Sequence, residues 1–237
     1  MRIVPGSRAL FIGLPGYGKT NLCMALLAGQ QSAVIWDAKH RTDEWLSPQW
    51  AKRFGYVITS DPEAIKVYPK VIFEVDDLWL QDRQGWAKPE RAAFAWTRAL
   101  QYAYDRGHTI QVHDEALSTL PSVAFHPLAR KAATQGRAGG TTLFVNMQAP
   151  TWTDTMTMKM AEHVFIFWTN NREDLEAIRS LRGIDPAPIA DLKGHDFAYH
   201  RAGAAALVVY DGSGIPQMIT GVKTGDIVAP TENAAAR

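Results

Sequence analysis

The sequence predicts an α/β protein in which helices cover both faces of a mostly parallel central sheet. Short apolar runs alternate along the chain with segments of helical period, and this alternation is typical of a parallel sheet. The 237 residues suffice for one α/β domain with a substantial core, and no linker is evident. We therefore expect a single domain over residues 1–237, in which residues 225–237 form a flexible tail.

The individual elements are assigned from their local patterns. The apolar run at 8–12 ends at a glycine and predicts a buried strand, whereas 19–28 carries leucines at helical spacing and stops at Gly29, which predicts a helix. Further strands are expected at 33–36, 67–75, 109–113, 141–147 and 163–169, and further helices at 89–106, 127–135 and 171–181. The runs 204–210 and 217–222 flank an Asp-Gly-Ser-Gly turn and predict a C-terminal β-hairpin.

The composition excludes several classes of protein. Hydrophobic residues make up 46% of the chain and charged residues 21%, which excludes a disordered chain. The 25 basic residues balance 24 acidic ones, so any nucleic-acid contact is local or built up by oligomerisation. The single cysteine, Cys23, excludes an internal disulfide framework and fits a reducing compartment. No apolar run approaches the ~20 residues of a membrane span, so we expect a cytoplasmic protein without such a span.

The strongest motif lies between the first strand and the first helix. Residues 13–20 read Gly-Leu-Pro-Gly-Tyr-Gly-Lys-Thr and fit the P-loop pattern G-x-x-x-x-G-K-[ST] in the context that it requires. Glycines let backbone N–H groups turn toward phosphate oxygens, and the helix N-terminus adds positive potential. Lys19 is expected to reach the β- and γ-phosphates of ATP, and the Thr20 hydroxyl to hold Mg²⁺. The expected nucleotide-binding residues are Gly13, Leu14, Pro15, Gly16, Tyr17, Gly18, Lys19, Thr20 and Asn21.

Besides the Thr20 hydroxyl, the magnesium ion of a P-loop needs a carboxylate from elsewhere in the chain. An acid pair follows the strand expected at 109–113. Asp114 is expected to hold the metal through water, and Glu115 to polarise the attacking water as general base. The two acids can differ in their tasks because consecutive side chains leave a strand end in different directions. His113, inside the strand, is expected to be a structural neighbour rather than a catalyst.

Two further polar residues are candidates for the same chemistry. Gln148 ends the strand expected at 141–147 and precedes Ala149-Pro150, so it is expected to point into the nucleotide crevice and sense the γ-phosphate or orient water. The alternative is a strand-terminal amide that caps a loop. Arg137 follows a helix end, where a positive charge is stabilised by the helix dipole, so it can be an ordinary helix-end charge. The alternative is that Arg137 acts as an arginine finger on the nucleotide of an adjacent subunit.

Three segments besides the P-loop resemble, in order and spacing, the HerA/FtsK superfamily of DNA-translocating ATPases. The run 137–150, Arg-Ala-Gly-Gly-Thr-Thr-Leu-Phe-Val-Asn-Met-Gln-Ala-Pro, is similar to the segment before and through that family's glutamine strand. The strand at 34–39 ends in Asp-Ala-Lys and resembles the family's Asp-x-Lys, and 171–178 resembles its N-x-E-D-x-x-x-I helix. The resemblance covers about residues 8–210, and Ala149 departs from the arginine that the family often carries.

This resemblance implies a RecA-like core that works as a ring, usually a hexamer, with ATP between subunits and double-stranded DNA in the pore. A chain without membrane helices or extra domains most resembles the genome-packaging ATPases of icosahedral viruses with an internal membrane. The resemblance thus implies a motor in the host cytoplasm that meets capsid or portal-vertex proteins and can be incorporated at a virion vertex.

Contacts to DNA must be local, because the net charge of the chain is only +1. The stretch 116–153 contains no Asp or Glu but contains three basic residues, and a ring repeats each of them into a closed band of positive charge. An ordinary solvated side chain is the alternative for each of these positions. The candidate DNA contacts are Arg130, Lys131, Lys159, Arg83 and Lys88.

Other functions remain open from the sequence. A membrane-associated assembly or secretion ATPase of the filamentous-phage or pilus type typically brings a transmembrane helix, for which this sequence has no candidate, and dependence on lipid or a membrane partner rather than DNA would distinguish it. A small-molecule kinase would transfer phosphate to an acceptor other than water. A non-enzymatic nucleotide-binding module has no use for the general base expected at Glu115.

Overall fold

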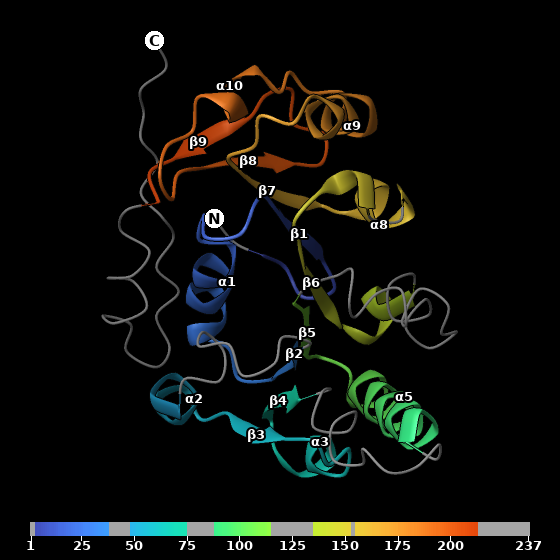
Figure 1. Ribbon diagram of the computed structural model, residues 1–237. Coiled ribbons are helices and arrows are strands. Elements are labelled where there is room, and N and C mark those ends of the chain that lie inside the picture. Colours follow the sequence, from blue (N-terminus) through green and yellow to red (C-terminus); the bar gives the residue numbers. More distant parts are fainter. Residues whose placement is uncertain (1–2, 38–47, 75–87, 115–134, 153–154, 213–237) are drawn as a thin grey trace. The chain divides into compact units, whose positions relative to one another are not determined.

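The computed structural model describes residues 3–37, 48–74, 88–114, 135–152 and 155–212 (Figure 1). In these ranges the strands form a mostly parallel sheet of nine, accompanied by helices. The predicted α/β class with a mostly parallel sheet is therefore confirmed. The tail expected at 225–237 and the helix expected at 127–135, except for Gln135, lie outside the described residues.

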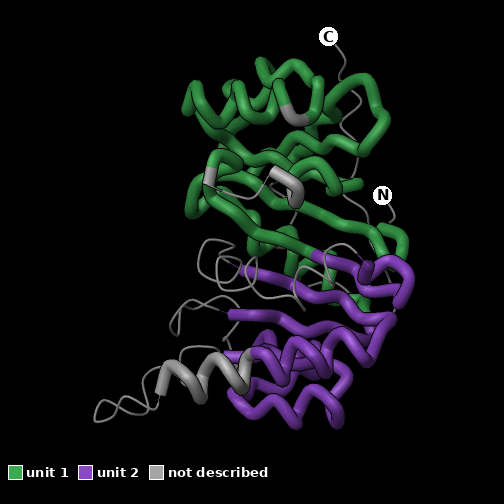
Figure 2. Tube along the Cα trace, turned by 90° about the vertical axis from the view of Figure 1, so that its right-hand side faces the viewer, with its two compact units in different colours: residues 1–30, 144–237 green, residues 31–143 purple. Residues whose placement is uncertain are grey.

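The chain divides into two compact units, which are coloured separately in Figure 2. The first unit joins two distant pieces of sequence, residues 1–30 and 144–237, whereas the second is the continuous stretch 31–143. The strand β6 (Thr142–Met147) begins in the second unit and continues in the first. The single domain expected over residues 1–237 stays a prediction.

The second unit carries four parallel strands in the order β3-β4-β2-β5. Their bounds are β2 Ala33–Asp37, β3 Val57–Thr59, β4 Lys70–Glu74 and β5 Ile110–His113. The long helix α5 (Lys88–Arg106) and the short α3 (Ala64–Val67) pack against these strands through one buried cluster. That cluster consists of Val34, Trp36, Ile65, Val71, Phe73, Ala99, Leu100 and Ala103. Because apolar burial drives folding, this cluster is the core of the unit.

The first unit carries the strand order β6-β1-β7-β8-β9. The bounds are β1 Arg8–Ile12, β7 His163–Phe167, β8 Phe197–Arg201 and β9 Val208–Tyr210, and the helices are α1 Lys19–Ala28, α8 Thr155–Met160, α9 Arg172–Arg182 and α10 Ala187–Ala190. β1 and β7 run parallel, with Phe11 opposite Phe165 and their rings stacked at 4.8 Å. These two central strands are buried throughout, which is why they read as continuous apolar runs.

A C-terminal hairpin is present, and one of its strands, β9, lies within the arm expected at 204–210. β9 pairs antiparallel with β8, and Phe197 lies opposite Tyr210 with the rings stacked at 5.2 Å. The second arm expected at 217–222 lies outside the described residues. The sequence did not predict β8 because the strand ends in His200 and Arg201 and contains no continuous apolar run.

The strand expected at 67–75 is shorter and begins later. Val67 ends α3, and β4 starts at Lys70. Val67 and Tyr68 are 71% and 44% exposed, so these apolar residues do not belong to a buried strand. The structure also contains short elements that the sequence did not predict: α2 Pro48–Phe54, β3, α3, α8, α10 and the 3₁₀ turns η1 Gly136–Gly139 and η2 Pro150–Trp152.

Candidate nucleotide site

The P-loop connects the carboxyl end of β1 to the N-terminus of α1, as predicted. Three of its glycines, Gly13, Gly16 and Gly18, have φ angles of 148°, 84° and 94°, which residues with side chains rarely adopt. Gly18 is the N-cap of α1, and the first turn of the helix contains no acidic residue. The N-terminal N–H groups of α1 thus meet no carboxylate from their own turn, and this arrangement fits a phosphate group.

The lysine and the threonine of the loop are both held in its interior. Lys19 and Thr20 are each 7% exposed. The Lys19 ammonium donates a hydrogen bond to the carbonyl oxygen of Leu14 at 2.9 Å, which keeps its positive charge inside the loop. The residues present therefore fit the triphosphate of ATP, because the loop combines a positive charge, a helix N-terminus and a glycine backbone that admits close approach.

Gly13 is required for packing as well as for its backbone conformation. A Cβ atom at this position would lie 2.7 Å from the Cβ of Phe167, the last residue of β7. At Gly16, by contrast, a Cβ atom would meet nothing within 4 Å. Alanine at Gly16 would therefore be strained only by its positive φ, whereas alanine at Gly13 would also collide with Phe167.

We expect Gly13→Ala to lower the free energy of unfolding by about 2–5 kcal/mol, because strain and overpacking add. The matched variant Gly16→Ala introduces strain without a collision, and we expect it to cost only about 1–2 kcal/mol. Urea unfolding of the two variants and the wild type measures both values. Equal losses for the two variants would show that the contact with Phe167 contributes nothing.

Gln148 lies beside the start of the P-loop. The N–H of Gly13 donates to the carbonyl oxygen of Met147 at 3.2 Å, and Gln148 is the next residue along the chain. Gln148 is half-buried and stands in the first unit together with the P-loop. The structure thus brings these two predicted features together at the carboxyl ends of β6 and β1.

The segment after Gln148 is tied to the helix α9, a contact that the sequence did not reveal. Asn171 caps α9, and its side-chain oxygen accepts from the N–H groups of Glu173 and Asp174. The Thr151 hydroxyl donates to the Asp174 carboxylate at 3.0 Å. Burial raises the pKa of Asp174, and the hydrogen bond from Thr151 opposes that shift. The N-x-E-D motif was the available signal for this anchor, which holds the chain that follows Gln148.

The acidic residues of the second unit end two neighbouring parallel strands. Asp37 is the last residue of β2, and Asp114 directly follows β5, with 2% and 1% exposure respectively. The N–H of Asp114 donates to the carbonyl oxygen of Trp36 at 3.2 Å, so the two carboxylates start from the same edge of the unit. Glu115 lies outside the described residues.

His113 sits inside β5 next to Asp114. Complete burial lowers its pKa to about 3, and its ring stacks on that of Trp36 at 6.0 Å. A histidine with this pKa is neutral at physiological pH and packs as an aromatic residue.

The remaining predicted residues are placed as follows. Arg137 is exposed in η1, Lys159 is exposed in α8, and Lys88 begins α5. The side chain of Lys88 is not described, and Arg83, Arg130 and Lys131 lie outside the described residues. In the described part of the chain no helix is long and apolar enough to cross a membrane.

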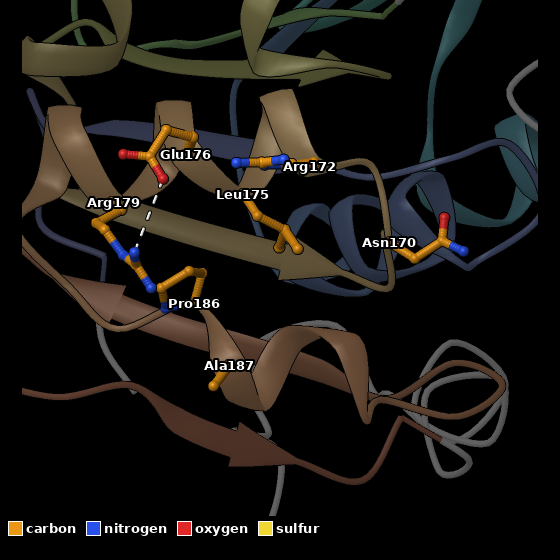
Figure 3. Close-up of a pocket in the computed structure, with 7 residues that line it drawn as sticks. All are labelled: Asn170, Arg172, Leu175, Glu176, Arg179, Pro186 and Ala187. Carbon is orange, nitrogen blue, oxygen red and sulfur yellow. Dashed lines mark ion pairs between the residues drawn. The ribbon is translucent and has the colours of Figure 1, made fainter.

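A pocket of about 360 Å³ lies between α9 and α10 in the first unit (Figure 3). Arg172, Glu176 and Arg179 project from α9 around it, and Glu176 pairs with Arg179 at 3.7 Å. No residue of the P-loop lines this pocket, so it is separate from the nucleotide site.

Two aromatic side chains and a histidine frame the P-loop in the first unit, and the sequence did not predict them together. The rings of Tyr17 and Trp168 stack at 5.2 Å, and the indole N–H of Trp168 donates to the carbonyl oxygen of Ala190 at 3.2 Å. A Cβ atom on Gly18 would lie 2.9 Å from Nδ1 of His195. Tyr17 and Trp168, and likewise Gly18 and His195, lie more than 150 positions apart in the sequence, so no local pattern predicts these two contacts.

No family model matches the sequence, and no curated protein matches it. The structure is similar to that of the genome packaging NTPase B204 from Sulfolobus turreted icosahedral virus 2 in complex with AMP. That similarity has 17% identity and a TM-score of 0.65, over 88% of this chain and 98% of that chain. The DNA-packaging ATPase B204 from Sulfolobus turreted icosahedral virus gives 19% identity and a TM-score of 0.62 over 88% and 98%.

VirB4 of Thermoanaerobacter pseudethanolicus is similar as well, with 13% identity and a TM-score of 0.61 over 90% of this chain and 91% of that chain. At identities of 13–19%, these similarities establish a common fold. The chain therefore has the RecA-like fold of these proteins, as the resemblance in its sequence implied.

Proposed function

We propose that this chain is an ATPase that translocates double-stranded DNA as an oligomeric ring and packages a viral genome into a preformed capsid. The observation that carries the proposal is the P-loop, in which Lys19 and Thr20 are buried at a helix N-terminus that glycines leave open to phosphate. The fold shared with the genome packaging NTPase B204 supports the choice among P-loop ATPases.

In this proposal, the P-loop and the predicted acidic residues act on one nucleotide. The backbone N–H groups of 13–20 hold the phosphates, and Lys19 neutralises the charge that develops on the transferred phosphoryl group. Thr20 and Asp114 would hold Mg²⁺, which supplies charge neutralisation when bound. The P-loop and Asp114 each follow the carboxyl end of a parallel strand, where α/β sheets bind their ligands, and this placement supports the assignment.

The remaining catalytic roles concern the attacking water and the neighbouring subunit. Glu115 takes a proton from the water as general base, and Gln148 orients that water against the γ-phosphate. Arg137 reaches the nucleotide of an adjacent subunit, and its exposure in η1 supports a role outside its own subunit. Each subunit is then complete only within an oligomer, which we propose is a hexameric ring.

DNA is proposed to pass through the pore of this ring without sequence recognition. A basic side chain repeated in every subunit tracks phosphates around a duplex and reads no bases. Lys159 is the described residue best suited to this contact, since it is exposed on α8. Arg83, Lys88, Arg130 and Lys131 are the other proposed contacts. The ring works in the host cytoplasm against capsid or portal-vertex proteins.

We expect double-stranded DNA to stimulate ATP hydrolysis, most strongly at low salt, where phosphate contacts are tightest. The measurement is the steady-state hydrolysis rate with and without duplex DNA at several salt concentrations, together with the particle mass in solution with ATP. The Lys19→Ala variant is the control for contaminating hydrolysis. Absence of stimulation at low salt in a protein that hydrolyses ATP would contradict the translocation proposal and leave the ATPase proposal intact.

A second candidate function is favoured by the similarity to VirB4, which covers 90% of this chain, against 88% for B204. In this alternative the chain is a membrane-associated assembly or secretion ATPase. Hydrolysis that responds to lipid vesicles or an integral membrane partner, and is indifferent to DNA, distinguishes this alternative from the DNA motor.

A further inference from the structure

The position of the nucleoside half of ATP follows from the two strands that flank β1 in the first unit. β1 lies between β6 and β7, and the P-loop leaves its carboxyl end. Gln148, at the end of β6, is the residue proposed above to face the γ-phosphate. With the γ-phosphate proposed at Gln148, we expect the nucleoside at the other end of the loop, toward β7 and β8.

The side chains on that side of the loop are fixed by contacts among themselves. Tyr17 of the P-loop stacks on Trp168, the residue that follows β7, and Trp168 is held by its hydrogen bond to Ala190. Ala190 ends α10, and the segment 191–196 leads from there to β8. The P-loop and the segment before β8 are thereby connected through one aromatic pair.

The same segment places His195 next to Gly18, the last glycine of the P-loop. The N–H of Asp196 donates to the carbonyl oxygen of Lys193 at 2.9 Å, and this turn presents His195. A Cβ atom on Gly18 would lie 2.9 Å from His195 Nδ1 and 3.5 Å from its Cγ, so the imidazole approaches the loop closely because residue 18 is glycine. His195 is otherwise exposed.

His195 differs in its surroundings from the buried histidines of the described chain. His113 is enclosed in the sheet, and His163 bonds to the hydroxyl of Tyr199 at 2.7 Å. His200 lies near Arg182 and bonds to the carbonyl oxygen of Ala204 at 3.0 Å. His195 combines an exposed imidazole with a close approach to Gly18 of the P-loop.

We propose that His195 contacts the nucleoside half of the bound nucleotide, beside the platform formed by Tyr17 and Trp168. This inference rests on the proposed ATPase function and adds to it the residue that distinguishes a nucleotide from a bare polyphosphate. A planar imidazole provides both a ring face and a hydrogen-bonding nitrogen, which are the groups that purine and ribose recognition uses.

The test compares two ligands of the same full-length protein, ATP and inorganic tripolyphosphate, both with Mg²⁺. Removing one such contact costs about a factor of five to ten in affinity. We expect His195→Ala to weaken ATP binding by that factor and to leave tripolyphosphate binding unchanged. The matched control is Lys193→Ala, an exposed neighbour in the same turn, for which both affinities are expected to stay unchanged. Thermal unfolding of each variant reports whether the fold is retained.

Two results would overturn the assignment of His195. Unchanged ATP binding in His195→Ala shows that the imidazole makes no contact with the nucleotide. Equal weakening of ATP and tripolyphosphate shows that it acts on the phosphates or on the shape of the P-loop. A wild-type protein that binds neither ligand instead overturns the proposed ATPase function, which separates the two failures.

Discussion

Replacing Arg137 by alanine is expected to lower the turnover number for ATP by roughly 10³–10⁵-fold while ATP still binds. The reason is that an arginine finger stabilises charge that develops only in the transition state, so its removal affects turnover far more than ground-state affinity. Arg137 is exposed at the short 3₁₀ turn η1. Steady-state kinetics with a separate binding measurement yields both quantities.

Mixing two inactive variants tests whether this arginine acts between subunits. Subunits with Arg137→Ala keep an intact P-loop, and subunits with Lys19→Ala keep an intact Arg137. In a mixed ring some interfaces combine both intact parts, so activity is expected to return on mixing. Arg172→Ala, an exposed arginine at the start of α9, is the matched control and is expected to retain activity. Mixtures that stay as inactive as the separate variants would rule out the role in trans.

The Glu115→Gln variant is expected to bind ATP with unchanged affinity and to lose turnover by roughly 10²–10⁴-fold. Glutamine has nearly the shape of glutamate but cannot take a proton from the attacking water. Binding of a fluorescent ATP analogue and release of phosphate are the two measurements.

The Lys19→Ala variant provides the contrast to Glu115→Gln. It removes the positive charge that the structure holds inside the P-loop, and its loss is expected to appear in binding as well as in turnover. Turnover near the wild-type level in Glu115→Gln would show that the base lies elsewhere.

Local patterns predicted the two elements that the P-loop connects. β1 and α1 have the predicted bounds, because a buried strand of five apolar or paired residues and a glycine-bounded helix are both visible within a short window. β5 was found for the same reason and starts one residue later than expected. The residues that the P-loop pattern names are therefore the ones that sequence reasoning places most securely.

Long-range contacts account for what the sequence did not reveal. β8 is a strand because it pairs with β7, with Phe197 opposite Phe167, although its own residues include histidine and arginine. His195 reaches Gly18 across 177 positions of sequence, and Trp168 reaches Tyr17 across 151. Val67 caused the opposite error. Its apolar side chain suggested a buried strand, but in the structure it is 71% exposed.

The division of the first unit into two sequence segments has a consequence for synthesis on the ribosome. β1 and the P-loop emerge early, but their neighbours β6 and β7 lie more than 120 residues later in the chain. The continuous stretch 31–143 is complete before β7 is translated, so it can collapse first. A nascent chain therefore carries a P-loop without its neighbouring strands until translation passes Phe167.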